Sequence, residues 1–384
     1  MNHLFDNYDD PDEDDALYEP NFDDEDDDER IARQLLAGAD LSELDHYDLP
    51  PGYHIESEDA PFFDDEEIEL LEIESADWQE TLAALPDPAY LLTPAYLRAL
   101  SDLHTEQIEQ LRNLWPTIAP DRRVAIVEHI FELSTIDWAV DGLTVATIAL
   151  ADDLGTVRAT ALDILAEDCP PRLAHQIITL FQTDPDPRVR ASAASVLGQF
   201  IYHALMDELP EAQAAPVETA LLTALRAEPP IPIRRRIIEA IGYIDRPDVQ
   251  AHIQTAYDHG DPDLRASAMR AMGNSLNADR WQATVLAELN TATTTPSVGF
   301  QAIYAAGELQ LTAALDPLLL LLTTNDTELR DGAIWALSEI GGRRARRGLT
   351  ALAEARPDDA ELQALIDEAL ANMELSSQIH YRDN

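Results

Sequence analysis

The stretch from residue 186 to residue 198 reads DPRVRASAASVLG, and residues 261–273 repeat it closely as DPDLRASAMRAMG. Looser copies of this motif occur at residues 122–130, 157–165, 233–242, 295–307 and 326–341. Recurrence of one short motif through a chain indicates a fold built from repeated supersecondary units. The motif therefore decides the fold, and each of its parts has a physical role.

The motif contains the signals that start and end a helix. An N-cap residue opens each well-formed copy, at Asp186, Asp261, Thr295 and Asp326, and in three of them proline follows, where its missing N–H costs nothing. An apolar residue follows three positions after the N-cap, as at Val189, and apolar or small side chains recur four and eight positions after that residue. This is the period of a helix and not of a strand. The closing glycine is expected to end the helix in the left-handed conformation, at Gly198, Gly242, Gly273, Gly307 and Gly341.

The arginine of the motif measures the length of one repeat. Its markers are Arg123, Arg158, Arg190, Arg234, Arg265, Gly299 in place of arginine, and Arg330, spaced 35, 32, 44, 31, 34 and 31 residues apart. Thirty-odd residues fit two antiparallel helices, and such units bury their apolar faces against their neighbours. The sequence therefore predicts an all-α fold, an α-solenoid over residues 77–375. The longest spacing places an insertion near residues 200–216, which we expect to extend a helix before an exposed turn at residues 211–215.

In its Asp, Val/Leu-Arg, Ala and Gly positions the motif resembles the HEAT-repeat family, in particular the short bacterial repeats of the phycobilin lyase type. The resemblance covers about residues 94–373 and implies that the motif opens the second helix of each pair. It also implies a ladder of contacts between successive repeats, made by Arg158, Asp186, Arg190, Arg234, Asp261, Arg265, Asp326 and Arg330. Gly299 breaks this pattern at one unit. Such motifs specify a fold far better than a function.

Composition narrows the classes of activity. The chain has 384 residues and a formal net charge of −49 at pH 7, so simple electrostatics opposes binding to nucleic acid phosphates. All 25 cationic residues are arginine, which excludes lysine Schiff-base chemistry and the lysine of a phosphate-binding loop. Cys169 is the only cysteine, which is typical of a cytosolic protein. We expect a cytoplasmic location with no membrane segment, because long apolar runs are missing.

The N-terminal segment differs from the rest. Residues 1–80 carry 31 carboxylates against two arginines, a net charge of −29. We expect residues 1–76 to form an acidic, mainly disordered arm, since this composition buries too little apolar surface to offset the entropy of ordering. Scattered aromatic residues suit an arm that recruits a basic partner, and a merely solubilising arm is the alternative. Residues 376–384 are expected to be a frayed tail.

Motifs for catalysis and cofactors are missing. The sequence contains no His-Glu-x-x-His, Gly-x-Ser-x-Gly, glycine-rich nucleotide loop or calcium loop. Glu128-His129 reverses the His-Glu pairs that hold iron in HEAT-type hydroxylases, and Cys169 is expected to be a small apolar residue and not a nucleophile. We therefore predict no catalytic residue, metal or cofactor. A lyase or hydroxylase-like enzyme on this scaffold, marked by pigment or iron, and a nucleic-acid-associated HEAT protein with a basic concave face remain the alternatives.

Phasing the repeats gives a candidate partner-binding face. Positions six residues after the apolar marker should point from the second helix toward the groove that the array curves around. They are Glu128, Asp163, Ser195, Glu239, Arg270, Tyr304 and Trp335. With Arg236 and Tyr243, the residues Arg270, Tyr304 and Trp335 form an arginine and aromatic set of the kind that dominates protein–protein hot spots. The sequence thus predicts a non-catalytic adaptor that grips another protein, unless these rings simply pack against adjoining helices. The acidic arm could then also fold back on the basic residues 343–347.

Overall fold

The computed structural model describes residues 75–136, 140–166 and 168–382, and every regular element in these ranges is helical. The predicted all-α solenoid is confirmed. The predicted arm, residues 1–76, lies almost entirely outside the described residues. Three helices open the described chain: α2 (Trp78–Ala84), α3 (Pro94–Arg98) and α4 (Thr105–Leu114).

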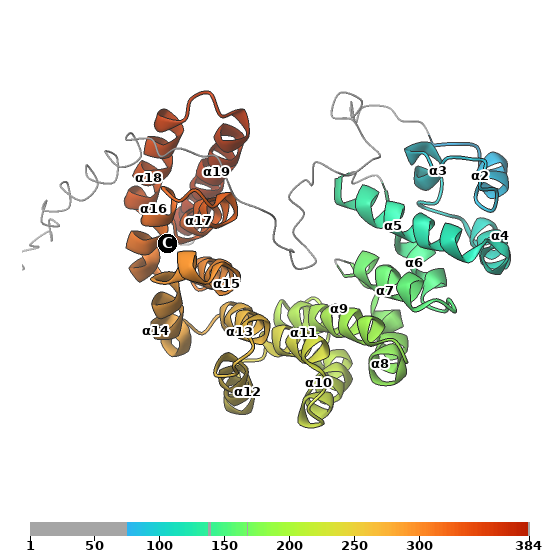
Figure 1. Cartoon of the computed structure of the whole chain (residues 1–384), viewed down its shortest axis with the longest axis horizontal. Coiled ribbons are helices and arrows are strands. Elements are labelled where there is room, and N and C mark those ends of the chain that lie inside the picture. The colour runs from blue at the N-terminus through green and yellow to red at the C-terminus, as the bar shows by residue number, and fades with distance from the viewer. Residues whose placement is uncertain (1–74, 137–139, 167, 383–384) are drawn as a thin grey trace, which may run out of the picture.

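Two layers of helices follow along one curve. The inner row consists of α5 (Pro120–Ile136), α7 (Gly155–Ile164), α9 (Pro187–Leu205), α11 (Ile231–Ile241), α13 (Pro262–Asn274), α15 (Pro296–Glu308), α17 (Thr327–Ile340) and α19 (Ala360–Arg382), each packed on the next. The outer row consists of α6 (Leu143–Ala149), α8 (Ala174–Thr183), α10 (Glu211–Arg226), α12 (Pro247–Tyr257), α14 (Ala278–Leu289), α16 (Leu315–Leu321) and α18 (Gly342–Ala355). Figure 1 shows the inner row on the concave side of a horseshoe. Short 3₁₀ turns lie at η1 (Trp115–Thr117), η2 (Pro171–Leu173), η3 (Ala292–Thr294) and η4 (Thr312–Ala314).

The helix starts agree with the motif. The Asp186 carboxylate accepts a hydrogen bond from the backbone N–H of Arg188, and the carboxylates of Asp261 and Asp326 cap α13 and α17 in the same way. Proline occupies the first turn of α9, α13 and α15. Thr295 is different because its hydroxyl makes no capping hydrogen bond to α15. Caps are therefore local features that the sequence predicted at three of four helices.

The glycines of the motif have another role than the one expected. Of the five, Gly341 alone has a positive φ, at 70°, and the prediction of left-handed helix ends is wrong for the others. A Cβ added to Gly273 would lie 2.9 Å from the Cα of Ala305, and one added to Gly198 would lie 3.0 Å from the Cα of Ala240. Glycine here allows neighbouring inner helices to approach closely. The left-handed residue after α13 is Leu276, with φ 51°.

The expected helix extension at the insertion is confirmed, and two segments that were expected to be non-helical are helical. The insertion lengthens α9 to 19 residues, and the expected turn at residues 211–215 instead forms the start of α10. An alanine-rich segment favours helix, so the connection shrinks to residues 206–210. At the other end, α19 continues to Arg382, through positions where a tail was expected.

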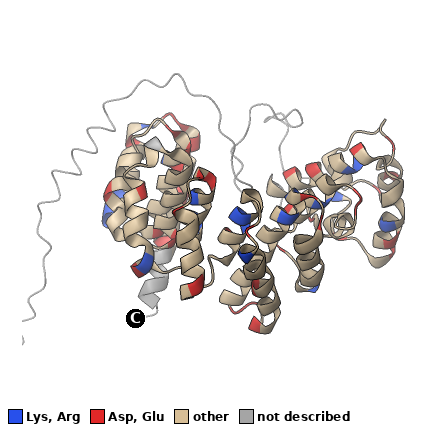
Figure 2. Cartoon of the chain, turned by 60° about the horizontal axis from the view of Figure 1, so that its bottom comes forward, with Lys and Arg blue, Asp and Glu red and all other residues tan. Residues whose placement is uncertain are grey.

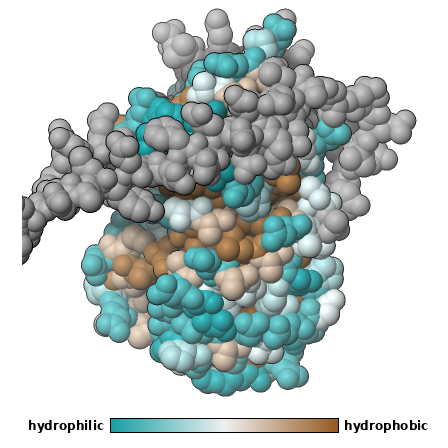
Figure 3. Space-filling view, turned by 90° about the vertical axis from the view of Figure 1, so that its left-hand side faces the viewer, coloured by the Kyte–Doolittle hydropathy of each residue, from teal (hydrophilic) through white to brown (hydrophobic). Residues whose placement is uncertain are grey.

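The surface is mixed in charge and hydropathy. Acidic and arginine residues lie interspersed along the array and do not separate into two regions (Figure 2). Seen from the side of α16 and α18, an apolar band crosses the surface between hydrophilic regions (Figure 3). None of the helices in the described ranges is long and apolar enough to cross a membrane.

Candidate partner-binding face

The predicted partner-binding residues all come from the inner row. Arg270 lies on α13, Tyr304 on α15 and Trp335 on α17, while Tyr243 follows the C-terminal end of α11. Arg270, Tyr304 and Trp335 mark the same position of their repeats, so the packing of successive inner helices brings these three side chains into one line, while Tyr243 lies one helical turn beyond that position in its own repeat. The phasing argument therefore placed these side chains on neighbouring helices of the concave row (Figure 1).

Three of these side chains form one stack, and the fourth, Tyr243, packs against a further ring. The Arg270 guanidinium lies 4.6 Å from the centroid of the Tyr304 ring, and the rings of Tyr304 and Trp335 stack with centroids 5.4 Å apart and planes 8° apart. Tyr243 packs against Tyr202 of α9, with centroids 5.2 Å apart. Cation–π and stacked aromatic contacts each contribute about 0.5–1.5 kcal/mol. We call Tyr202, Tyr243, Arg270, Tyr304 and Trp335 the aromatic row.

The aromatic row is partly buried. Arg270 and Trp335 cover the Tyr304 ring, and its hydroxyl donates a hydrogen bond to Asn274 Oδ1 at 3.2 Å. Burial raises the pKa of both Tyr304 and Tyr243 above the usual value for tyrosine. The rings are thus neither sealed between the two layers nor free in solvent. Packing along the row restricts the orientation of each ring and leaves a partly exposed edge on the concave face.

Sequence reasoning missed Tyr202. This residue lies in the insertion that lengthens α9 by extra turns, beyond the end of the repeated motif. The available signal was the helical register itself, because Tyr202 stands seven residues after Ser195 and so shares its side of α9. Ignoring the insertion when phasing the repeats removed it from consideration.

Arg236 does not join the aromatic row. Its guanidinium forms an ion pair with Glu239 at 2.8 Å on the same helix. The other carboxylate oxygen of Glu239 accepts a hydrogen bond from the Ser267 hydroxyl of α13 at 2.5 Å. Arg236 instead borders a hollow in the concave face, farther toward the N-terminal end of the array.

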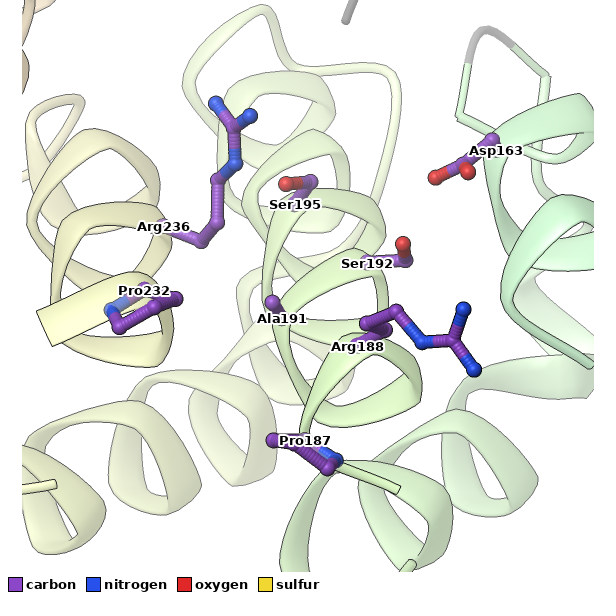
Figure 4. Close-up of a pocket in the computed structure, with 8 residues that line it drawn as sticks. All are labelled: Asp163, Pro187, Arg188, Ala191, Ser192, Ser195, Pro232 and Arg236. Atoms are coloured by element: carbon purple, nitrogen blue, oxygen red, sulfur yellow. The ribbon is translucent and has the colours of Figure 1, made fainter. Parts of the chain in front are cut away.

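That hollow, which we call the α9 hollow, has a volume of about 300 Å³, at the lower end of the range for ligand pockets. Small residues of α9 form its floor, α7 contributes one wall and α11 the other (Figure 4). Its lining residues are Asp163, Pro187, Arg188, Ala191, Ser192, Ser195, Pro232 and Arg236. Figure 4 shows the carboxylate of Asp163 and the guanidinium of Arg236 on opposite sides of the two serines.

Asp163 differs from the other charged residues of the α9 hollow because burial affects the protonation of its carboxyl group. Burial raises the pKa of its carboxyl group, and a hydrogen bond with Ser192 and the field of Arg236 only partly oppose this. The site therefore combines one poorly solvated carboxylate, two hydroxyls and the apolar surfaces of two prolines. Such a set can bind a polar group, and it holds no nucleophile with an activating base.

In two repeats an arginine of the motif binds an aspartate of the next repeat, as the resemblance implies. The aspartate is not the one that the resemblance assigns to the ladder. The Arg158 guanidinium binds Asp184 of the next repeat through two hydrogen bonds of 2.8 Å. One repeat earlier, Arg123 binds Asp152 at 2.7 Å. These acids lie in the turn before the inner helix and not at its N-cap. The ladder aspartates Asp186, Asp261 and Asp326 instead cap their own helices.

The other ladder arginines find different acceptors. Arg190 donates to the backbone carbonyl of Phe181 at 3.0 Å, Arg265 contacts the buried Glu288, and Arg330 pairs with its neighbour Asp331. In the α11 repeat, the residue that bridges to α13 is Arg235 and not Arg234, through hydrogen bonds to Asp263 and Ser267. The family pattern therefore held for Arg158, which bridges to the next repeat, but Arg190 and Arg330 bond within their own repeat, and the acidic partners differ from those implied.

The Gly299 departure from the pattern has a steric cause. A Cβ added to Gly299 would lie 2.5 Å from the Cα of Ala292, in the η3 turn. An arginine side chain cannot start in that space. The α15 repeat thus replaces its arginine with a close backbone contact.

Cys169 and His129 are the remaining candidates for chemistry. Burial raises the pKa of the Cys169 thiol to about 12, so the thiol is protonated near neutral pH. Within the described part of the chain, no group of three or more histidine, cysteine or acidic side chains is placed to hold a metal ion. His129 lies on α5 without such a group around it.

Comparison with known families agrees with this architecture. The family model for a HEAT repeat matches residues 173–204, and the model for paired HEAT repeats matches residues 218–298 and 283–371. The chain is a HEAT-repeat protein. The matched part of the HEAT array spans α8 to α19 and therefore includes the whole aromatic row. Nothing in these matches distinguishes the phycobilin lyase type, and no curated protein matches the chain.

Proposed function

We propose that this HEAT array is a non-catalytic adaptor that binds a segment of another protein along its concave face. The observation that carries the proposal is the aromatic row, because stacked tyrosine, tryptophan and arginine side chains already fixed in one orientation lose little entropy on binding. HEAT repeats commonly mediate protein–protein interaction, which agrees with this role.

The charge of the chain supports a protein partner over a nucleic acid. With a net charge of −49, the chain as a whole repels phosphates over distances of the order of the Debye length. The single cysteine and the lack of a membrane-spanning helix in the described part suit action in the cytoplasm. We extend the proposal to the acidic arm, residues 1–76. The arm would either recruit a basic partner or cover the concave face in the absence of the partner.

Photocrosslinking tests the adaptor function. A benzophenone amino acid placed at Gln199 on the concave row should capture a defined partner in cells, while the same group at Gln282 on the outer helix α14 should not. Once the captured partner is identified, Arg270→Glu should weaken its affinity for the full chain at least about 30-fold, because the loss of an arginine at a binding hot spot costs about 2 kcal/mol or more. Equal capture from both positions would refute a concave binding face.

A matched control comes from the outer layer. Arg280 of α14 stacks on Trp281 at 4.1 Å, so it also makes a cation–π contact, but on the outer row. Arg280→Glu makes the same charge change as Arg270→Glu and should leave partner binding within about twofold of the wild type. A comparable loss of binding in both variants would show that overall charge, and not the aromatic row, controls the interaction.

A further inference from the structure

Asp163 of the α9 hollow forms no ion pair with another described residue. Arg188 pairs with Asp186 at 2.8 Å and Arg236 with Glu239 at 2.8 Å, so each guanidinium group already has a carboxylate partner, although the charge of Arg236 still acts on Asp163. Among the described residues, no cationic nitrogen lies within 4.0 Å of the Asp163 carboxylate. The local balance of the α9 hollow is therefore negative.

The neighbouring surface has the same sign. Helix α5 packs against α7 and carries Glu128 and Glu132, both exposed. Such a field attracts a positive group toward the N-terminal half of the concave face and repels a negative one. An anion in the α9 hollow would meet two arginines that already have carboxylate partners, and the carboxylate of Asp163 would repel it. The α9 hollow therefore favours a cation over an anion.

The shape of the α9 hollow suits a long side chain with a charged end. Pro187, Ala191 and Pro232 offer apolar surface along its length, and Ser192 and Ser195 lie between Asp163 and Arg236. Lysine and arginine bury their methylene stems against apolar surface while the charged group binds acceptors. Charge-assisted hydrogen bonds of this kind are stronger than hydrogen bonds between neutral groups.

We propose that the α9 hollow is a specificity subsite that takes one lysine or arginine side chain of the bound partner segment, with Asp163 as its counter-ion. The inference rests on the adaptor function proposed above and adds the chemistry of the partner to it. Burial of Asp163 agrees with this role, since a carboxylate that is poorly solvated in the free protein gains more from a cation than an exposed one does.

The test uses the full chain and synthetic peptides. Three acetylated and amidated Gly-Ser decamers carry benzoylphenylalanine beside a central lysine, norleucine or glutamate. Mass spectrometry then locates the crosslinks. We expect the lysine peptide to label segments 155–166 and 187–199 about tenfold more than the norleucine or glutamate peptides. Asp163→Asn should abolish this preference, and Asp279→Asn, an equal charge change on the outer helix α14, should retain it.

The outcomes separate this inference from the adaptor function. Labelling confined to α13, α15 and α17, with equal yields for the three peptides, would remove the cation subsite and leave the concave binding face intact. Preference for the glutamate peptide would also overturn the subsite and indicate an anion site at Arg188 and Arg236. If Asp163→Asn loses the preference for lysine but its thermal unfolding midpoint is at or above that of the wild type, a folding defect is excluded. That result would support the proposal.

Discussion

The contact at Gly273 gives the sharpest test of how the repeats pack. We expect Gly273→Ala to destabilise the protein although alanine is the better helix former. Gly273 lies inside α13, where replacing glycine with alanine normally gains about 1 kcal/mol. The new methyl group would start 2.9 Å from the Cα of Ala305 and 3.2 Å from its Cβ.

The magnitude follows from these two opposing effects. Overpacking a tight core costs about 1–3 kcal/mol, and the upper part of that range applies because the obstructing atom belongs to the backbone of α15. After the gain in helix propensity, the net loss should be about 1–2 kcal/mol. Gly273→Asn should lose more than Gly273→Ala, because the larger amide needs more space. At a left-handed helix end the order would be reversed, since asparagine is tolerated there.

Urea unfolding followed by circular dichroism measures the loss, and amide hydrogen exchange locates it to α13 and α15. Gly260→Ala is the control, because no atom lies within 4 Å of its added Cβ, and it should change stability by less than about 1 kcal/mol. Leu276→Gly should raise stability by about 1 kcal/mol by relieving the left-handed backbone of a leucine. Stabilisation by Gly273→Ala, or better tolerance of Gly273→Asn, would refute the close-contact explanation.

Three further predictions concern single positions. Arg158→Met should cost about 3–5 kcal/mol in urea unfolding, because it leaves the buried carboxylate of Asp184 without its cation. Restoring the motif with Gly299→Arg should destabilise the array, since Ala292 occupies the space the side chain needs, and amide exchange should rise first in α15. Asp163→Asn should keep or raise stability at pH 7: the raised pKa of this carboxyl means that its ionised form opposes folding, so any advantage of the variant disappears as the pH falls through that pKa.

Each of these has a control or a contrary result. Arg188→Met removes an exposed ion pair and should change stability by less than about 1 kcal/mol; an effect equal to that of Arg158→Met would contradict the ladder energetics. An unfolding curve for Gly299→Arg that matches the wild type would show that the η3 turn moves freely. Destabilisation of Asp163→Asn at pH 7 would mean that the carboxylate supports the fold.

The sequence predicted the local features of the fold well. Helix starts at Asp186 and Asp261, the apolar stripe and the repeat length were all readable, because caps and helical periods depend on residues a few positions apart. The phasing of position six also placed Arg270, Tyr304 and Trp335 on neighbouring inner helices. These predictions hold because helix caps and apolar stripes follow short-range rules that most of the repeats share.

The acidic partners were harder to predict. Asp184 and Asp186 are two residues apart in the same turn, yet the first binds Arg158 and the second caps α9. Which acid reaches the preceding repeat depends on how far that repeat is displaced along the helix axis. The role of Tyr202 likewise depends on the extra turns of α9, which a regular repeat does not contain.

By itself, the sequence determined that the chain forms helix pairs, how long each pair is, and which side of each helix is apolar. Tertiary structure alone decided that the motif glycines serve close approach, that the aromatic side chains stack into a row, and that Asp163 faces a hollow without an ionic partner. The physical reason is one of range. Hydrogen-bonded turns and helical periods are set within about four residues of the chain, whereas the spacing and twist between stacked repeats emerge only when about thirty residues of each unit pack against the next.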